Sequence, residues 1–300
     1  MMSESRKQVL AIASLALLAV GWGAIPLFVR NDVPSIALVG ARVTFGALAL
    51  IGVAAVLGKL EFPKMRRWRL VLSGVLLALH WITFFESIKL TTVAVALAVL
   101  YLGPIAASIL SGPFLGERVT PRLWVALAIA AGGTLLVVQP WARNSEGGGS
   151  EITIEGIAMA ALSAALLAAL MLVGKPVAKD LGGLTMAIGE LTVASVLLAP
   201  ATYQAVTQYS DYIVNFVILG AVFTGFAGYV YWEAMRHLPV AVVSVIMYIE
   251  PATAVLWAAA FLDETPNLAT WLGVGLVIAG GAVAATAATE SEVLSVPATL

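Results

Sequence analysis

The chain has 300 residues, of which 61% are hydrophobic and 11% charged, and its formal net charge is −1. A soluble globular domain is about 45–50% apolar and about 25% charged, so this chain has too few polar side chains to cover itself in water. The absence of cysteine excludes disulfide scaffolds, thiolate metal sites and thiol nucleophiles, and the near-neutral charge provides no basic surface for nucleic acid. The composition therefore predicts a membrane protein.

Ten apolar runs are long enough to cross a bilayer core of about 30 Å, which takes about 20 helical residues. In chain order they cover residues 9–29, 35–57, 68–88, 91–114, 122–141, 153–174, 183–200, 212–235, 239–262 and 268–288. They lack the alternation of polar and apolar residues that is typical of barrel strands, so an all-α polytopic protein is predicted. The first run is longer than the apolar core of a secretory signal peptide, and we expect it to remain as a span.

Lysine and arginine predict the direction in which these helices cross the membrane. With the N-terminus inside, twelve of the 16 basic residues lie in cytoplasmic segments or at their span ends, three lie in outer segments, and Arg42 lies within a span. The positive-inside rule therefore predicts that the N- and C-termini are both cytoplasmic. The outer loop 144–151 contains a glycine run and is expected to be a flexible linker, and the tail 290–300 is expected to be disordered.

The sequence contains an internal repeat with an offset of 147 residues. Residues 101–124 and 248–271 share seven identities in 24 positions, including Tyr101 with Tyr248 and Pro104 with Pro251. Chance would give roughly one identity in ten positions. The first repeat is predicted over residues 1–145 and the second over residues 153–289.

Each repeat holds five predicted spans, and because five is odd the second copy enters the membrane in the opposite orientation. Inverted repeats are a recurring architecture of secondary transporters, which bind substrate near the bilayer midplane between the two copies. The sequence therefore predicts ten transmembrane helices in two inverted five-helix repeats. We expect alternating access, with the first four spans of each repeat moving and the fifth and tenth spans bracing them.

A family resemblance rests on the segment from Lys89 to Val138, which contains Tyr101-x-x-Pro104, Leu115-Gly116-Glu117-Arg118-Val119-Thr120-Pro121, Trp124 and Gly132-Gly133. This segment resembles part of an EamA repeat. The second copy keeps Pro251, Glu264 and Trp271 but has Asp263-Glu264-Thr265 in place of the Gly-Glu-Arg pattern. The whole chain resembles the ten-helix drug/metabolite transporter (DMT) superfamily, and within it the bacterial aromatic amino-acid exporters of the YddG type.

This resemblance implies a secondary exporter in the bacterial inner membrane, with a central cavity lined by both halves and no cofactor. Aromatic and other neutral amino acids, or similar small metabolites, are the implied substrates. Relatives on the same repeat also carry cationic drugs, so that alternative stays open. The lipid bilayer is the other expected partner. Glycines of the last span suit internal packing and a dimer face equally, so a monomer and a homodimer are both compatible with the sequence.

Ionisable residues within spans are costly in a bilayer, so each is a candidate for function. Arg42 and Glu190 lie at comparable depth in spans two and seven. They either hold a substrate carboxylate and ammonium, or gate opposite mouths of the transporter. The structural alternatives are an ion pair, or long side chains that reach the membrane interface. His80 either contacts substrate or protons, or bonds to a neighbouring helix. Glu250, whose counterpart in the first repeat is Gly103, is expected to bind substrate or a proton.

Aromatic residues within spans are the expected specificity elements, because they stack on apolar side chains and hold cations over ring faces. The full set of predicted substrate-binding residues is Trp22, Arg42, His80, Trp81, Phe84, Tyr101, Glu190, Tyr229, Tyr248 and Glu250. Pro104 and Pro251 each remove one backbone hydrogen bond, and we expect them to act as hinges. The alternatives are simple packing for the prolines, a packed or lipid-facing position for the aromatic residues, and a bond to another helix for Glu250.

An intramembrane enzyme is the main alternative from another functional class. The sequence has two isolated histidines and neither a His-Glu-x-x-His motif nor a phosphate-binding loop. No catalytic or metal-binding residue is therefore assigned, and transport is predicted.

Overall fold

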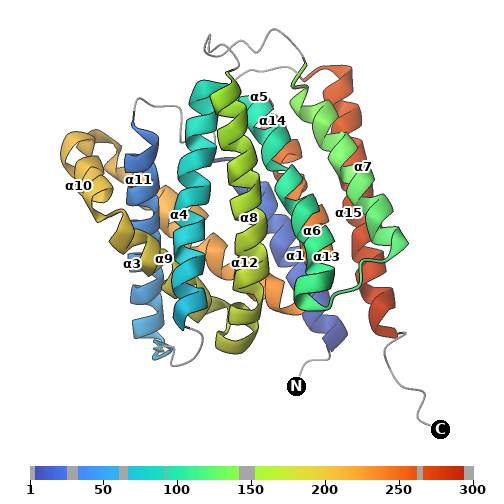
Figure 1. Cartoon of the computed structure of the whole chain (residues 1–300), viewed down its shortest axis with the longest axis horizontal. Helices are drawn as coiled ribbons and strands as arrows, with labels where there is room; N and C mark the ends of the chain where they lie inside the picture. The colour runs from blue at the N-terminus through green and yellow to red at the C-terminus, as the bar shows by residue number, and fades with distance from the viewer. Residues whose placement is uncertain are drawn as a thin grey trace.

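The structure is a computed structural model, and it describes residues 4–25, 33–60, 67–91, 93–141, 153–261 and 266–293. These residues form helices and no strand. Figure 1 shows the helices side by side, running between two ends of the molecule, with α1 (Glu4–Trp22) beginning and α15 (Leu268–Val293) ending at the same end. The prediction of an all-α polytopic membrane protein is confirmed.

The first five predicted spans correspond to α1, α3 (Ser35–Val56), α4 (Arg67–Leu90), α5 (Val93–Leu100), α6 (Leu102–Leu115) and α7 (Pro121–Val138). Helix α1 ends seven residues before the predicted span does. Gly21 and Gly23 weaken the helix at this point, and Pro26 disfavours helical backbone in the residue before it. The fourth predicted span is divided at Tyr101 into α5 and α6.

The second half contains α8 (Ile154–Leu181), α9 (Gly183–Leu197), α10 (Ala199–Gln208), η1 (Ser210–Tyr212), α11 (Ile213–Gly220), η2 (Ala221–Phe226), α12 (Ala227–His237), α13 (Val240–Met247) and α14 (Ile249–Phe261). Three differences from the predicted spans stand out. Helix α8 continues seven residues further, α10 is bent by 74° from α9, and η2 is a π-helical segment between α11 and α12.

Eight helical stretches of the described chain are long and apolar enough to cross a membrane, or nine if the bent pair α9 and α10 forms one span. Helix α1, which has Arg6 and Lys7 near its start, is not among them. The multi-pass character is therefore clear, and the number ten stays a prediction. Helix α15 continues to Val293, so residues 290–293 of the expected tail are helical. The expected linker 144–151 lies outside the described residues.

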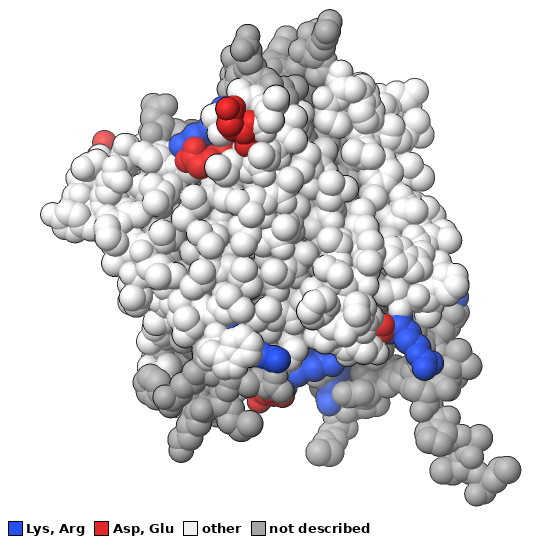
Figure 2. All heavy atoms as spheres, viewed as in Figure 1, with Lys and Arg blue, Asp and Glu red and all other residues white. Residues whose placement is uncertain are grey.

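Charged side chains are separated along the length of the helices. Figure 2 shows most of the visible lysine and arginine at the lower end of this face, acidic residues mainly at the upper end, and an uncharged band between them. We call the lower end, where α8 and α15 end, the basic end. An uncharged band between two charged ends is what a bilayer core between two headgroup layers requires.

Helices α7 and α15 pack against each other along their length (Figure 1). A Cβ added to Gly273 would lie 2.5 Å from the carbonyl oxygen of Gly133, and one added to Gly280 would lie 2.9 Å from that of Ala126. Gly275 and Gly281 have no neighbour within 4 Å of such an atom. The glycines of the last span therefore serve internal packing at two positions and leave two positions unused.

The two matched tyrosines mark breaks between helices. Tyr101 separates α5 from α6, and Tyr248 separates α13 from α14. Pro104 and Pro251 each follow three residues later, and a proline cannot donate to the carbonyl four residues before it. The carbonyls of Leu100 and Met247 therefore lack their normal helical partner, which explains why both helices break at the same point of the repeat. The hinge role of the two prolines stays a prediction.

Candidate substrate-binding site

Arg42 is a buried cation in the middle of the helix bundle, on α3. Its side chain is only 3% exposed, and its Nε donates a hydrogen bond of 3.0 Å to Oγ1 of Thr224 in η2. The guanidinium lies over the ring of Trp81, 4.1 Å from the ring centroid, and 5.8 Å from that of Phe85. Because the described chain places no carboxylate within 4.0 Å of it, the guanidinium can still accept an anionic ligand.

Glu250 is the anionic counterpart of Arg42 on α14. The two side chains interact electrostatically without forming an ion pair, and the Glu250 carboxylate accepts a hydrogen bond from the Tyr101 phenol. The Tyr101 ring lies 5.0 Å from that of Tyr248. Just after α1, a Cβ on Gly23 would lie 2.9 Å from the Glu250 carbonyl, so the backbone here packs closely against the start of α14.

His80 is buried near the middle of α4 and is bonded to α8. Its Nδ1 lies 2.8 Å from Oγ of Ser163 and 3.1 Å from the Ser163 carbonyl, and the Ser163 hydroxyl also reaches the His80 carbonyl. The bond to a neighbouring helix, one of the two readings of this histidine, is therefore present. Phe84, one turn along α4, stacks at 6.5 Å from the imidazole and lies 5.5 Å from Phe85.

Glu190 lies in a second group with Trp232 of α12, and it does not pair with Arg42 as the sequence allowed. Its carboxylate accepts a hydrogen bond from Nε1 of Trp232. The Trp232 ring contacts Tyr231, which in turn lies 6.0 Å from Trp22. The structure thus brings one predicted set together around Arg42 and Glu250 and keeps Glu190 apart from it.

Two more predicted residues lie at the edge of these groups. Trp22 donates from its indole to the carbonyl of Phe223 in η2, the residue next to Thr224. The π-helical segment therefore supports both Trp22 and Arg42, and π-helical turns often occur at functional sites. Tyr229, by contrast, has its ring contact with Phe226, which is 59% exposed. Tyr229 is not brought to Arg42 by any ring contact or hydrogen bond of the described residues.

Three features of the site could not be found from the sequence pattern. Thr224 is an ordinary polar residue in an apolar run, and the π-helical turn around it has no sequence signature. Trp232 is one of several aromatic residues within the predicted spans, and nothing in the sequence pairs it with Glu190. Lys175 is one of the twelve basic residues that predict orientation, and the sequence indicates no other role for it. Its place between Gly174 and Pro176 within a continuing helix, α8, was the signal available.

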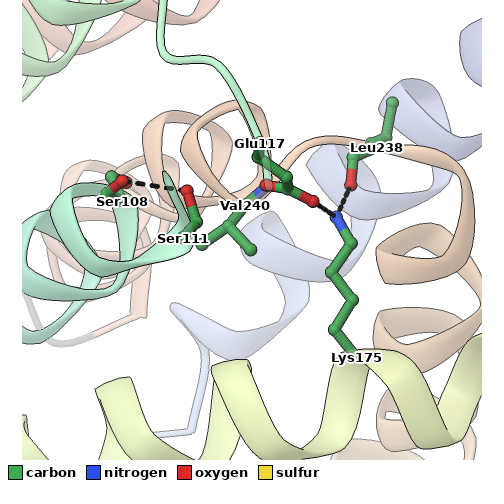
Figure 3. Close-up of polar contacts among 6 residues, drawn as sticks. All are labelled: Ser108, Ser111, Glu117, Lys175, Leu238 and Val240. Atoms are coloured by element: carbon green, nitrogen blue, oxygen red, sulfur yellow. Dashed lines mark hydrogen bonds and ion pairs between the residues drawn. The ribbon is translucent and has the colours of Figure 1, made fainter. Parts of the chain in front are cut away.

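Lys175 is the centre of a polar network near the basic end, shown in Figure 3. Its side chain is 2% exposed, pairs with Oε1 of Glu117 at 2.5 Å, and donates to the carbonyl of Leu238. The second oxygen of Glu117 accepts from the backbone N–H of Val240 at 2.8 Å. Glu117 belongs to the first predicted repeat, whereas Lys175, Leu238 and Val240 belong to the second, so this network joins the two halves.

The pockets of the described structure lie away from the predicted site residues, and its side chains form no metal-binding group. A pocket of about 500 Å³ lies along α3, and another of about 300 Å³ lies between α3, α9 and α10. Neither is lined by a predicted site residue. The part of the chain that the structure describes has no group of three or more histidine, aspartate or glutamate side chains that could hold a metal ion.

Comparisons with known proteins agree with this architecture. The chain matches the EamA-like transporter family over residues 9–139 and 154–286. It is 24% identical over 288 residues to the uncharacterized transporter YxxF of Bacillus subtilis, covering 93% of this chain and 91% of that protein. It is 27% identical over 240 residues to the threonine/homoserine exporter RhtA of Escherichia coli, covering 79% of this chain and 77% of that protein.

The fold also has a counterpart among solved structures. One crystal structure superimposes with a TM-score of 0.76 at 22% identity, covering 95% of this chain and 98% of the other chain. At this identity the likeness concerns the fold alone. The two family matches together cover well over half of the sequence. The chain is a multi-pass membrane transporter that belongs to the EamA-like transporter family.

Proposed function

We propose that this protein exports neutral amino acids from the cytoplasm by alternating access and catalyses no chemical reaction. The observation that carries the proposal is the pair Arg42 and Glu250, a buried cation and a carboxylate that interact electrostatically without forming an ion pair. An amino acid carries a carboxylate and an ammonium on adjacent carbons, so it can neutralise both groups at once. Threonine/homoserine export by RhtA is in keeping with this substrate class.

The side chains around this pair suit the remaining parts of such a substrate. The planar guanidinium of Arg42 can bind a carboxylate in a bidentate manner, because only its Nε is used by Thr224. Glu250 can accept a hydrogen bond from the substrate ammonium once this bond replaces the one from the Tyr101 phenol. Trp81 and Phe84 then offer aromatic faces to an apolar or aromatic side chain.

The charge distribution supports an assignment of the orientation of the protein in the membrane. Because the basic end carries the end of α8 with Lys179 and the end of α12 with Arg236, we assign it to the cytoplasm of a bacterial cell under the positive-inside rule. The start of α1 and the end of α15 then lie on the cytoplasmic side. The Glu117–Lys175 network joins the two halves near this end, so opening toward the cytoplasm requires it to separate.

Counterflow into proteoliposomes tests the proposal. Vesicles loaded with one unlabelled amino acid at a time, without a membrane potential or pH gradient, should take up the same labelled amino acid faster than empty vesicles. Phenylalanine, tryptophan, methionine and threonine form the panel. Arg42→Ala should abolish this uptake, and Glu250→Gln should reduce it by about tenfold or more, since each removes a charge-assisted bond of about 1.5–3 kcal/mol.

Lys89→Gln is the matched control, because Lys89 is an exposed cation in the last turn of α4 that forms an ion pair with Glu86. It should transport as the unaltered protein does. Normal counterflow by Arg42→Ala would contradict the proposed site. Uptake of cationic drugs with no response to any amino acid would contradict the substrate class and favour the drug-export alternative.

A further inference from the structure

Glu190 is a deeply buried carboxyl group for which the structure provides one hydrogen bond and no counter-ion. Its side chain is 3% exposed. Oε1 accepts from the indole N–H of Trp232, whereas Oε2 is fully buried and has no hydrogen-bond partner among the described residues. Buried side-chain oxygens normally have partners, so an orphaned oxygen on an ionisable group calls for an explanation.

Among the described residues, no cation of the elements packed against α9 forms an ion pair with this carboxyl group. These elements include α3, α4, α8, α10, α12 and η2. Arg42 of α3 acts electrostatically on Glu250, and Lys175 of α8 is paired with Glu117. The histidine of α4, His80, is bonded to Ser163. Also on α4, Arg69 lies over the ring of Trp68 and Lys89 pairs with Glu86.

The remaining neighbouring elements provide no counter-ion for Glu190 among the described residues. Helix α12 places the phenol of Tyr231 within electrostatic reach of Glu190, and the acidic and basic residues further along α12 bond to one another. Helix α10 carries Tyr203, which is 70% exposed, and η2 has no titratable side chain. Within the described chain, the surroundings of Glu190 are therefore neutral.

The hydrogen-bond donor of this group is fixed in place. Trp232 is 1% exposed, and a Cβ on Gly174 of α8 would lie 2.2 Å from its ring. The indole therefore fills a space that only glycine leaves open, and it cannot withdraw from Glu190 without moving α8. One neutral hydrogen-bond donor offsets only a small part of the free energy needed to bury an ionised carboxylate. A protonated carboxyl group carries no charge and avoids this penalty.

We propose that Glu190 is a proton-binding site and that the protein exchanges one proton for each molecule of exported substrate. This inference rests on the proposed function. In the conformation described here Glu190 holds a proton on Oε2. When the helices rearrange and expose the carboxyl to the cytoplasm, the proton leaves, and substrate binding at Arg42 and Glu250 follows. Because α9, which carries Glu190, packs against α3, which carries Arg42, proton binding at Glu190 and substrate binding at Arg42 affect each other through this contact.

Gradient-driven uptake tests this proposal in the full-length protein. Proteoliposomes that are acidic inside are given labelled threonine, or labelled phenylalanine if counterflow shows that it is the better substrate. A difference of one pH unit is worth about 1.4 kcal/mol, which a one-for-one exchanger converts into about tenfold accumulation. The unaltered protein should accumulate substrate above equilibrium, and an entrapped pH dye should report proton exit.

Glu190→Gln is the decisive variant, because the amide keeps the shape and can still accept from Trp232 but cannot release a proton. It should retain counterflow without a gradient and lose the accumulation. Glu190→Asp retains a carboxyl group and should keep part of the accumulation. Glu86→Gln, an exposed carboxylate on α4, is the control and should behave as the unaltered protein.

Each outcome of these measurements decides the proposal. Accumulation by Glu190→Gln equal to that of the unaltered protein overturns it. Counterflow without any accumulation by the unaltered protein also overturns it and leaves the proposed function intact, whereas absence of counterflow refutes both. If Glu190→Gln does not fold, infrared difference spectra of the unaltered protein decide. A band of a buried un-ionised carboxyl that shifts in Glu190→Asp supports the proposal, and its absence overturns it.

Discussion

The hydroxyl of Tyr248 donates a hydrogen bond of 2.7 Å to the carbonyl of Tyr101, and the two residues are equivalent positions of the internal repeat, 147 residues apart. Their rings lie 5.0 Å apart. The contact is one-sided, because the Tyr101 phenol bonds to Glu250 instead. The equivalent of Glu250 in the first repeat is Gly103, so the carboxylate and its tyrosine partner make one half of the site chemically different from the other.

Replacing Tyr248 by phenylalanine should destabilise the protein by about 1 kcal/mol, because the buried carbonyl of Tyr101 loses its donor. Thermal unfolding in detergent measures this change. Tyr203→Phe is the matched control, since Tyr203 is 70% exposed on α10, and it should unfold as the unaltered protein does. Equal stability of Tyr248→Phe and Tyr203→Phe would show that the tyrosine contact contributes nothing.

Breaking the Glu117–Lys175 pair should be more costly than removing it altogether. Lys175→Met leaves Glu117 without a counter-ion, and Glu117→Gln leaves a buried ammonium, so each change should cost about 3–5 kcal/mol. The double variant should cost less than either single variant, and therefore less than their sum, because neither charge is then left alone. Unfolding of the two single variants and the double variant gives this coupling.

Additive effects in that cycle would contradict a direct pairing in the folded protein. The control is the exposed pair Glu86–Lys89, with N and O 3.6 Å apart. An exposed pair on a helix contributes only about 0.3–0.5 kcal/mol, so the same cycle there should show little coupling.

Because α7 packs closely against α15, two glycines of α15 should respond differently to substitution by alanine. Gly273→Ala should destabilise the protein by about 1–3 kcal/mol, because its new Cβ meets the backbone of α7, which cannot move aside as a side chain could. Gly275→Ala places a Cβ where no atom lies within 4 Å and should have no such effect. Thermal unfolding of the two variants side by side checks the helix interface, and equal behaviour would contradict it.

The position of the Arg42 guanidinium over Trp81 should affect substrate affinity. Trp81→Leu removes a cation–π interaction of about 0.5–2 kcal/mol, so the half-saturating substrate concentration in counterflow should rise by about two- to thirtyfold. Trp81→Phe keeps an aromatic face and should have a smaller effect. Trp68→Leu alters an exposed Trp–Arg contact at the start of α4 and should leave affinity unchanged. Equal affinities in all three variants would place Arg42 outside the substrate site.

The fold class and the spans followed from the sequence because both depend on local quantities. Long apolar runs have to be helical in a bilayer, where every backbone group needs a partner within its own segment. The run 35–57 accordingly forms α3 with nearly the predicted bounds. The boundaries that differ lie where glycine or proline competes with helix formation, as at the end of α1 and at the bend between α9 and α10.

The sequence could not predict which buried groups contact one another, because these contacts depend on how helices distant in the sequence pack together. Sequence alone singled out Arg42, Glu190, His80 and Glu250 as costly groups within a membrane. Only the tertiary structure decided that Arg42 interacts electrostatically with Glu250, that Glu190 bonds to Trp232, and that His80 bonds to Ser163. It also drew Lys175, a residue that had served only to predict orientation, into contact with Glu117 from the other half of the chain.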